Sequence, residues 1–550
     1  MFTISCPIYL KIYVNYFKFL TTYYKFYRGV DTSLHKYLII KNINKFHSDH
    51  LQMISMLKRE FGILLLLGCL ILASVPTALC QSPAPTVYVA GDGSGDFNCD
   101  GKDDHVQINQ ALKFVAANSE YTTVHLKGPF TYVINDTLLI GSNTILEGDS
   151  TAVIKLANNA GWVSMKPLIQ QMSSSGNSNI VIRGFEVNVN HDGNPYLADG
   201  KTPLAKGRGY YNVMYFLYCK NVTVCDMYMH DGHGDGLRIK YGENIQFYDN
   251  RIYKLGHDGL FAIQCQNVEA WNNTITCRTN SGLRIWNSNH VKFHDNVIDS
   301  FYHWSAGGPG IQVEKSAGTM DDIDIYNNRI NNTYGPGIWL FNYDTSTTKD
   351  EGKNIHIHHN VFYSTGTNPS ITWVGGILGS GFHDTLIENN VFDSAYNVAI
   401  VSMSPDGFFS DYTSKYTTIV RNNIIVNTQK RTKSPSGTGY GIANYLPETH
   451  SFEIAYNCLY NNSAGNYENC ASKADIHIRP LFVDQENHDY HLQSRGGSWN
   501  GKTWVKYKVS SPCIDSGYPS SDYSTEPEDN GNRINIGRYG NTIYASKSKH

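Results

Sequence analysis

Residues 230–286 read HDGHGDGLRIKYGENIQFYDNRIYKLGHDGLFAIQCQNVEAWNNTITCRTNSGLRIW, and one short unit recurs within and around them. The apolar residues Val222, Ile245, Val268 and Val291 begin successive units at a constant spacing of 23 residues. A fixed period of this size is typical of stacked repeats. Apolar residues alternate within each unit and form no helical face, so each unit consists of strands and turns. The pattern predicts an all-β solenoid, a single-stranded right-handed parallel β-helix.

The repeat extends well beyond this stretch, with insertions that lengthen some units. The positions that begin successive units are Ile180, Val222, Ile245, Val268, Val291, Ile323, Ile355, Thr385, Thr418 and Phe452. An Asn follows five residues later in the regular units, at Asn250, Asn273, Asn296, Asn328, Asn360, Asn390, Asn423 and Asn457. Stacked Asn side chains can bond the neighbouring Asn above and below. We therefore interpret this column as structural.

Two features predict how the repeat begins. The segment 91–104 is dense in Asp and Gly and resembles half of a calcium loop, but Gln107 stands where such loops place a bidentate Glu. We favour a turn. Residues 105–118 then carry apolar residues at helical spacing behind Asp104, a candidate N-cap. A helix here would cap the open end of the first coil.

The N-terminal part differs from the rest in composition. We interpret residues 1–55 as a mis-assigned start or a disordered segment. Residues 56–80 have a basic start, an apolar run and a small-residue exit, which predicts a signal peptide rather than a membrane anchor. The β-helix with its terminal caps would then span residues 86–542, followed by a disordered tail at 543–550. These features predict a secreted or cell-surface protein without a membrane span after cleavage.

Charge and cysteine content narrow the function classes. The formal net charge is −3 and 17% of the residues are charged, without the basic clusters that nucleic-acid binding requires. Eight of the eleven cysteines follow the predicted signal peptide, an even number that permits disulfides of undetermined pairing. The sequence leaves the oligomeric state open, and an oligomer is allowed.

Three motifs carry a resemblance to a known family. They are VYVAGDGSGDFNCDGKDDHVQINQAL at 87–112, the repeated N-x-D/N-N-x-I coils with their GDGL and HDGL turns, and SPCIDSG at 511–517. In these motifs the chain resembles the disaggregatase-related β-helix proteins of methanogenic archaea. The resemblance implies an enzyme that degrades an acidic, chondroitin-like cell-surface polysaccharide.

Strand alternation places a set of polar and aromatic side chains on an outer face. In residues 236–240, Leu237 and Ile239 would point inward and Arg238 and Lys240 outward. The matching strands give two columns: Arg238, Arg284, Gln312, Trp339 and Lys240, Trp286, Glu314, Phe341. Cations and aromatic rings together suit an anionic sugar chain. We expect substrate-binding residues at Arg238, Lys240, Arg284, Trp286, His303, Trp304 and Trp339.

The His/Asp turns beside this face are the candidates for catalysis. His-Asp-Gly recurs at residues 191, 230 and 257, out of register with the repeat. We expect catalytic residues among Asp231, His233, Asp235, His257, Asp258 and Glu314, on exposed turns around a groove, where they could supply acid and base. We expect no metal ligands and no cofactor, with calcium as the open alternative.

The reaction itself stays open at this point. Family resemblance favours a glycoside hydrolase over a polysaccharide lyase. The alternative from another class is a non-catalytic surface or envelope protein that binds the same acidic polysaccharide.

Overall fold

The computed structural model describes residues 85–201, 211–277, 280–299, 308–344, 351–368, 375–403, 415–430 and 439–548. The predicted signal peptide and the segment before it lie outside these residues. Residues 84–550 form one compact unit. Within the described part of the chain, no helix combines the length and the hydrophobicity that a membrane crossing requires.

Three parallel sheets run along the repeats, and each coil contributes one strand to each sheet in the order A, B, C. Sheet A contains β1 (Thr86–Ala90), β2 (Phe97–Asn98), β3 (Thr123–Leu126), β6 (Thr144–Gly148), β9 (Ser178–Arg183), β12 (Lys220–Cys225), β15 (Glu243–Tyr248), β18 (Gln266–Trp271), β21 (Asn289–His294), β24 (Ile323–Tyr326), β27 (Ile355–His358), β30 (Thr385–Glu388), β33 (Tyr416–Arg421) and β36 (His450–Ala455). Sheet B contains β4 (Phe130–Ile134), β7 (Ala152–Leu156), β10 (Glu186–Asn188), β13 (Tyr228–His230), β16 (Arg251–Leu255), β19 (Thr274–Cys277), β22 (Val297–Asp299), β25 (Arg329–Asn331), β28 (Val361–Tyr363), β31 (Val391–Asp393), β34 (Ile424–Val426) and β37 (Cys458–Tyr460). Sheet C contains β5 (Leu138–Ile140), β8 (Pro167–Gln171), β11 (Asn212–Leu217), β14 (Leu237–Lys240), β17 (Leu260–Ile263), β20 (Leu283–Trp286), β23 (Ile311–Lys315), β26 (Ile338–Asn342), β29 (Gly375–Ser380), β32 (Val398–Ser402), β35 (Tyr440–Asn444) and β38 (Gly465–Glu468).

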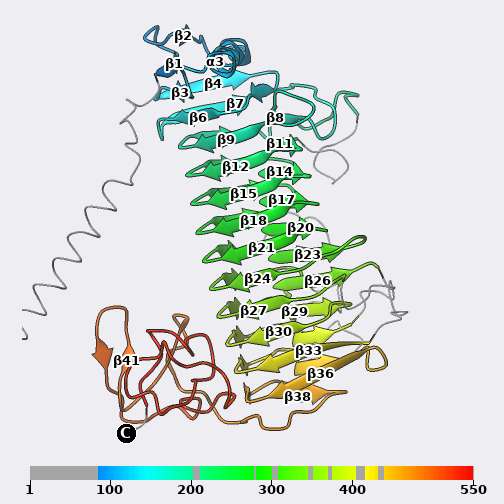
Figure 1. Cartoon of the computed structure of the whole chain (residues 1–550), viewed down its shortest axis with the longest axis vertical. Helices are drawn as coiled ribbons and strands as arrows, with labels where there is room; N and C mark the ends of the chain where they lie inside the picture. The colour runs from blue at the N-terminus through cyan, green and yellow to red at the C-terminus, as the bar shows by residue number, and fades with distance from the viewer. Residues whose placement is uncertain are drawn as a thin grey trace, which may run out of the picture. The chain divides into compact units, whose positions relative to one another are not determined.

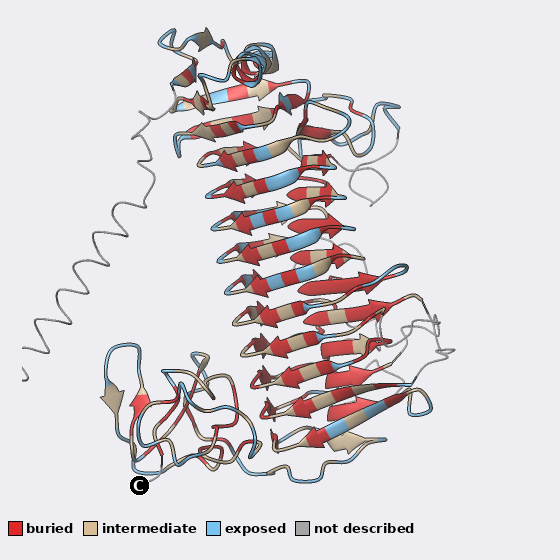
Figure 2. Cartoon of the chain, viewed as in Figure 1, coloured by how far each residue is buried: buried red, intermediate tan, exposed pale blue. Residues whose placement is uncertain are grey.

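The register of sheet A confirms the predicted repeat. All ten positions from Ile180 to Phe452 pair with one another in successive strands. The strands stack as a regular ladder (Figure 1). Buried and more exposed residues alternate along them, because successive side chains point to opposite faces (Figure 2). The interior is a continuous apolar core, and each fully buried Ile, Val or Leu contributes about 1.5–3 kcal/mol.

The predicted Asn column is a buried ladder at the turn from sheet A to sheet B. Asn273 accepts hydrogen bonds from the backbone N and from Nδ2 of Asn250, both at 3.0 Å. Asn273 Nδ2 donates in turn to Asn296 Oδ1 at 2.9 Å. The same pattern continues down to Asn457, where Asp475 replaces the next Asn. The ladder therefore satisfies polar groups that each coil would otherwise bury unpaired.

One helix, α3 (His105–Ala117), lies at the N-terminal end, as predicted. Ile108, Ala111, Leu112 and Val115 are its buried residues. Asp104 occupies the N-cap position but makes no side-chain cap bond. Its carboxylate instead accepts hydrogen bonds from the backbone N of Asp100, Gly101 and Val133, at 3.1, 3.0 and 2.7 Å. The acidic segment before the helix thus uses this carboxylate to hold a turn.

The C-terminal segment differs from the prediction of a simple cap. Isolated bridges at Ser472 and Ile476 extend the last coil, but the following residues pack along the outer face of sheet B. Two antiparallel pairs follow, β39 (Phe482–Asp484) with β40 (Asp489–Leu492) and β41 (Ser498–Trp499) with β42 (Trp504–Val505). Phe482 and Tyr490 join Val361 and other outward residues of sheet B in a second apolar cluster.

The disordered tail predicted at 543–550 is wrong for its described part. Ala545, Ser546 and Ser548 are buried. The Ser546 hydroxyl donates to Leu492 O at 2.6 Å, so the end of the chain closes the lateral segment. The sequence showed no repeat here from which this packing could be predicted.

Candidate functional site

The predicted outer columns are present on sheet C. Arg238, Phe261, Arg284, Gln312 and Trp339 occupy one register position in five successive strands. The neighbouring column consists of Lys240, Ile263, Trp286, Glu314 and Phe341. Phe261 and Ile263, both on β17, complete these columns and were not among the predicted residues.

Beneath these columns the structure places a ladder of acids at the turn into sheet C. The backbone N of Asp235 donates to Asn212, and Asp235 Oδ1 accepts from the backbone N of Asp258 at 2.9 Å. Asp258 Oδ1 accepts from the backbone N of Ser281 at 2.7 Å. Both carboxylates have 0% exposed surface. The expectation that they lie on exposed turns is therefore wrong. Each carboxylate is buried because its oxygen accepts a hydrogen bond from a backbone N–H of the next coil.

His257 joins the two acids. Its Nδ1 lies 2.6 Å from Asp235 Oδ1 and 3.0 Å from Asp258 Oδ2. Burial disfavours the charged imidazolium, but Asp258 and Asp235 more than offset burial and hold the pKa of His257 well above its ordinary value of 6.5. The two acids therefore favour protonation of His257, whose Nε2 lies 3.3 Å from the side-chain amide of Asn280.

Two arginines complete the charge balance. Arg238 Nη1 lies 3.1 Å from Asp235 Oδ2, and Arg284 Nη1 lies 3.5 Å from Asp258 Oδ2. Burial opposes ionisation of Asp258, but His257 and then Arg284 outweigh it, so the pKa of Asp258 lies below its ordinary value. This carboxyl is therefore ionised at neutral pH and cannot donate a proton.

Glu314 is part of the same network. Its Oε2 lies 2.6 Å from Arg284 Nη2 and 2.7 Å from Nε, and its Oε1 accepts a hydrogen bond from Tyr343 at 2.8 Å. Glu314 is 1% exposed, which contradicts its predicted place on an open groove. Three acids and three cations thus compensate one another below the surface of sheet C.

An open groove of about 480 Å³ lies over this network. It is lined by Arg238, Lys240, His257, Phe261, Ile263, Gln264, Arg284, Trp286, Asn287 and Ser316. The Arg284 guanidinium lies 4.2 Å from the centroid of the Phe261 ring and 5.5 Å from that of Trp286. These cation–π contacts hold the guanidinium groups against the wall of the groove. The groove presents cations and rings, whereas its carboxylates lie underneath.

Other predicted residues lie apart from the groove. Asp231 pairs with His230 at 2.8 Å in the turn after β13. His233 is buried, stacks on His191 at 4.0 Å between ring centroids, and bonds the carbonyl oxygen of that residue. Neither is among the residues that line the groove, and their predicted catalytic role stays a prediction. Leu237 pairs with Leu260, so His233 stands one position earlier in its turn than His257 does.

The remaining predicted residues are the aromatic and loop positions. Trp339 packs edge-on against Phe341, one strand beyond Gln312 and Glu314, and it does not line the groove. His303 and Trp304 lie outside the described residues. Their predicted contact with substrate stays a prediction.

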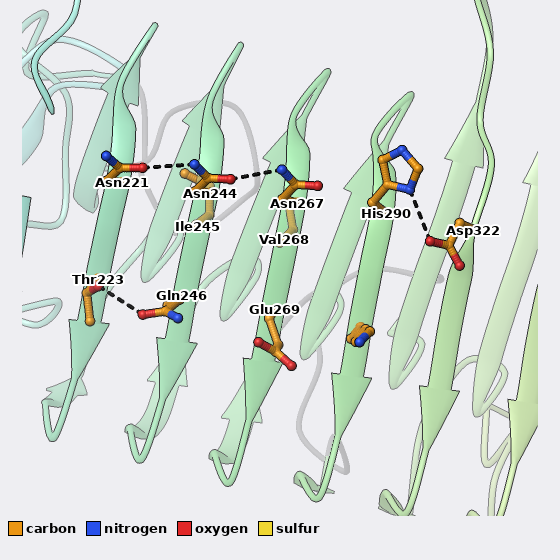
Figure 3. Close-up of a pocket in the computed structure, with 11 residues that line it drawn as sticks. Asn221, Thr223, Asn244, Ile245, Gln246, Asn267, Val268, Glu269, His290 and Asp322 are labelled. Carbon is orange, nitrogen blue, oxygen red and sulfur yellow. Dashed lines mark hydrogen bonds and ion pairs between the residues drawn. The ribbon is translucent and has the colours of Figure 1, made fainter. Parts of the chain in front are cut away.

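A second groove, which the sequence analysis missed, lies on the outer face of sheet A (Figure 3). It measures about 640 Å³, and Asn221, Asn244 and Asn267 form one edge as an exposed ladder, with Nδ2 to Oδ1 distances of 2.9 and 2.8 Å. These three residues have positive φ, which Asn tolerates better than most residues. The sequence signal for this ladder is the Asn that immediately precedes the leading apolar residue of three successive units.

Next to this groove, aromatic rings stack along sheet A. Tyr248 and Trp271 stack at 4.2 Å between ring centroids, and His294, Tyr326 and His358 continue the column at 6.0, 4.7 and 5.1 Å. Ring planes within this column are nearly parallel. Their faces are therefore occupied by one another and are not presented to a sugar ring.

Among the described residues, two groups of side chains have the composition of a metal-binding site. Asp235, His257 and Asp258 form one below the sheet C groove, and Asp324, His356 and His358 form the other on sheet A. The second was missed, although Ile355–His356–Ile357–His358 places two His on the same face of a strand.

Comparison with known proteins supports the fold and the resemblance. Residues 320–517 match the family model described as disaggregatase related, and residues 135–348 match the model of a right-handed β-helix region. The predicted resemblance and fold class are thereby confirmed. A search of curated proteins finds no match.

Solved structures with a similar chain path include proteins of several kinds. The A-module of the mannuronan C-5 epimerase AlgE6 from Azotobacter vinelandii is 16% identical, with 69% of this chain and 97% of that chain covered and a TM-score of 0.48. An exopolygalacturonase from Thermotoga maritima is 12% identical, with 68% and 87% covered and a TM-score of 0.43. The surface adhesin PfbA of Streptococcus pneumoniae is 12% identical, with 77% and 99% covered and a TM-score of 0.44. At these identities the likenesses carry no inference about activity.

Proposed function

We propose that this protein is an exported enzyme that binds an acidic, chondroitin-like polysaccharide along the outer face of sheet C and cleaves it there. The observation that carries the proposal is the groove over β14, β17 and β20, where Arg238, Lys240, His257 and Arg284 stand beside Phe261 and Trp286. The disaggregatase-related match supports the same substrate class. The signal-like segment before residue 81 supports export to the cell surface or medium.

The lining of the groove suits recognition of an anionic sugar. Guanidinium groups bind carboxylate or sulfate through paired hydrogen bonds, and an indole provides a flat apolar face for a pyranose ring. Lys240 adds a positive charge next to Trp286. The ion pairs underneath hold both guanidinium groups in place before substrate arrives, which lowers the entropic cost of binding.

His257 is the proposed general acid. Asp235 and Asp258 keep it protonated and orient its ring through Nδ1, while its other edge belongs to the groove. Protonation of the glycosidic oxygen assists both hydrolysis and elimination, so this role holds for either reaction. Asp235 and Asp258 act as positioning residues, because they are buried and paired.

Two reactions are compatible with this arrangement. Family resemblance favours hydrolysis. A glycosidase that follows the usual mechanism needs two carboxyl groups at the sugar, and no carboxylate is among the described residues that line the groove. Elimination at a uronate instead needs a cation beside the sugar carboxylate and a base that removes the C5 proton, and the groove offers Arg238 and Arg284 for the first role and the amine of Lys240 for the second. Elimination is therefore the second candidate.

Incubation of the purified full-length chain with an acidic, uronate-containing polysaccharide tests the proposal. New reducing ends without ultraviolet absorbance of an unsaturated uronate indicate hydrolysis, and the appearance of that absorbance indicates elimination. Retention of the polysaccharide without any cleavage would instead establish the non-catalytic binding protein.

A matched pair of variants tests the role of His257. His257→Gln is expected to lower kcat about 100-fold or more, as loss of a general acid does. His294→Gln removes a His with a similar pair of acidic neighbours on sheet A and should leave cleavage unchanged. Equal activity in both variants would place the acid elsewhere. Lys240→Gln should raise KM without changing the melting temperature.

A further inference from the structure

Three potential ligand atoms converge on the outer face of sheet A, away from the sheet C groove. Asp324 lies on β24, and His356 and His358 lie on β27, where His356 is the register partner of Asp324. Asp324 Oδ1 is 3.0 Å from His358 Nε2 and 3.9 Å from His356 Nδ1. All three ligand atoms lie within 4.8 Å of one another.

These separations match those of a zinc-type site. Tetrahedral zinc with bonds of about 2.0–2.1 Å to nitrogen and oxygen has ligand–ligand separations of about 3.3–3.4 Å. The two distances from Asp324 Oδ1 lie on either side of this value. Displacements of the ligand atoms by a few tenths of an ångström are sufficient to bring all three to bonding distance from one ion.

The outer nitrogen of each imidazole already has a partner that orients the ring. His356 Nε2 lies 3.0 Å from Glu388 Oε1, and Arg421 Nε donates to the other oxygen of that carboxylate at 2.7 Å. A carboxylate accepts from the His356 Nε2–H, which leaves the Nδ1 lone pair directed toward Asp324. Carboxylate–histidine–metal arrangements use this same second contact.

His358 is oriented through a relay to the C-terminal segment. His359 Nε2 lies 2.8 Å from the carbonyl oxygen of Gly540, which can only accept, so His359 donates there. With Nε2 as its donor atom, His359 accepts at Nδ1 from His358 Nδ1–H, at 2.6 Å. His358 Nε2 donates to Asp324 Oδ1 at 3.0 Å, because a carboxylate can only accept, and a bound cation would take the place of this proton. Two imidazole nitrogens and a carboxylate thus converge on one point.

We propose that Asp324, His356 and His358 bind a divalent transition-metal ion of the Zn²⁺ class, with Glu388 and His359 as positioning residues. Two imidazoles and one carboxylate suit such ions better than Ca²⁺ or Mg²⁺, which prefer oxygen ligands. The side chains of Asp324 and His356 are 30% and 38% exposed, so a further coordination position faces solvent. That position suits water or an oxygen of an acidic glycan.

The similar group below sheet C is a poorer site. Arg238 lies 3.1 Å from Asp235, and Arg284 lies 3.5 Å from Asp258, so the charge of both carboxylates is already neutralised. A second cation there would be repelled by both guanidinium groups. On sheet A the nearby guanidinium of Arg421 instead binds Glu388, behind the metal-facing side of His356.

Isothermal titration calorimetry of the metal-free full-length chain with Zn²⁺ alone tests the proposal. We expect a saturable site in the wild type, lost in Asp324→Asn and in His358→Gln. Glu388→Gln should weaken it about 10- to 100-fold, as loss of such an orienting contact does. His294→Gln, on the same face, and His257→Gln, in the other group, should keep it.

Co²⁺ provides a second measurement that depends on ligand identity. Wild-type chain loaded with Co²⁺ should show visible absorption bands of a low-coordinate nitrogen–oxygen site, and these bands should disappear in folded Asp324→Asn. The proposal is overturned if the wild type binds no Zn²⁺. It is equally overturned if Asp324→Asn and His358→Gln bind Zn²⁺ as tightly as the wild type.

Discussion

Sheets A and C are both built of parallel strands, yet the charged side chains on their outer faces differ in how deeply they are buried. On sheet C the acids lie beneath the cations, and Glu314 pairs with Arg284 at 1% and 11% side-chain exposure. On sheet A the acid of the corresponding pair stands at the surface, and Glu269 pairs with His294 at 39% and 14% side-chain exposure. The alternation of a strand decides which side chains point outward. The residues one coil above and below decide whether those side chains reach solvent.

The largest expected effect follows from the burial of these pairs. Glu314→Gln leaves the Arg284 charge buried with a weaker partner and should lower the free energy of unfolding by about 3–5 kcal/mol. Glu269→Gln breaks an exposed pair and should cost about 0–1 kcal/mol. Chemical denaturation of both variants beside the wild type measures the difference.

The double variant Glu314→Gln, Arg284→Met provides the internal check. Removal of both charges should recover much of the stability lost in the single variant, because no unpaired ion remains. If Glu314→Gln and Glu269→Gln lose the same free energy of unfolding, burial does not make the ion pair on sheet C stronger than the pair on sheet A.

Much of the fold could be predicted because the repeat imposes its own register. Apolar residues at alternate positions must face the interior, and a constant spacing places the same position of each coil in one column. The sequence therefore predicted the pairing of all ten leading positions, the buried Asn ladder and the two outer columns of sheet C. Strand alternation and the constant spacing are sufficient to predict these three features.

The candidate site was predicted less well because its contacts join residues that are distant in sequence. Arg284 and Glu314 are 30 residues apart, on β20 and β23, and nothing in either strand shows that they form an ion pair. Asp235 was taken for an exposed turn residue, although its carboxylate replaces a backbone acceptor for the next coil. The lateral packing of the C-terminal segment, which orients His359, depends on a surface that no repeat encodes.

The second comparison concerns the two Asn ladders. Asn273→Ala removes the acceptor for the backbone N and the side chain of Asn250 and should cost about 1–3 kcal/mol, because a buried donor loses its partner. Asn244 lies on the exposed ladder with φ of 58°, so Gly is the replacement that avoids backbone strain. Asn244→Gly should cost about 0.5 kcal/mol or less.

Thermal unfolding distinguishes the two ladders. Only Asn273→Ala should lower the melting temperature clearly, and both variants should retain the circular dichroism of a β-helix. A comparable loss in Asn244→Gly would mean that the exposed ladder on sheet A also stabilises the stack of coils.

The last expected effect is a pH dependence of stability that arises at His257 in the sheet C network. The pKa of His257 is raised above 6.5 in the folded chain by Asp258 and Asp235, against the opposing effect of burial. Its stabilising contribution is therefore complete below pH 6.5, the ordinary value for an unfolded His, and is lost as pH rises through the folded pKa. One such proton gives a slope of at most about 1.4 kcal/mol per pH unit.

Unfolding free energies measured at several pH values above 6.5 should fall more steeply for the wild type than for His257→Gln. Parallel curves for the wild type and His257→Gln would mean that His257 is not held as a cation, and with that result its role as the acid in the sheet C groove would also fail.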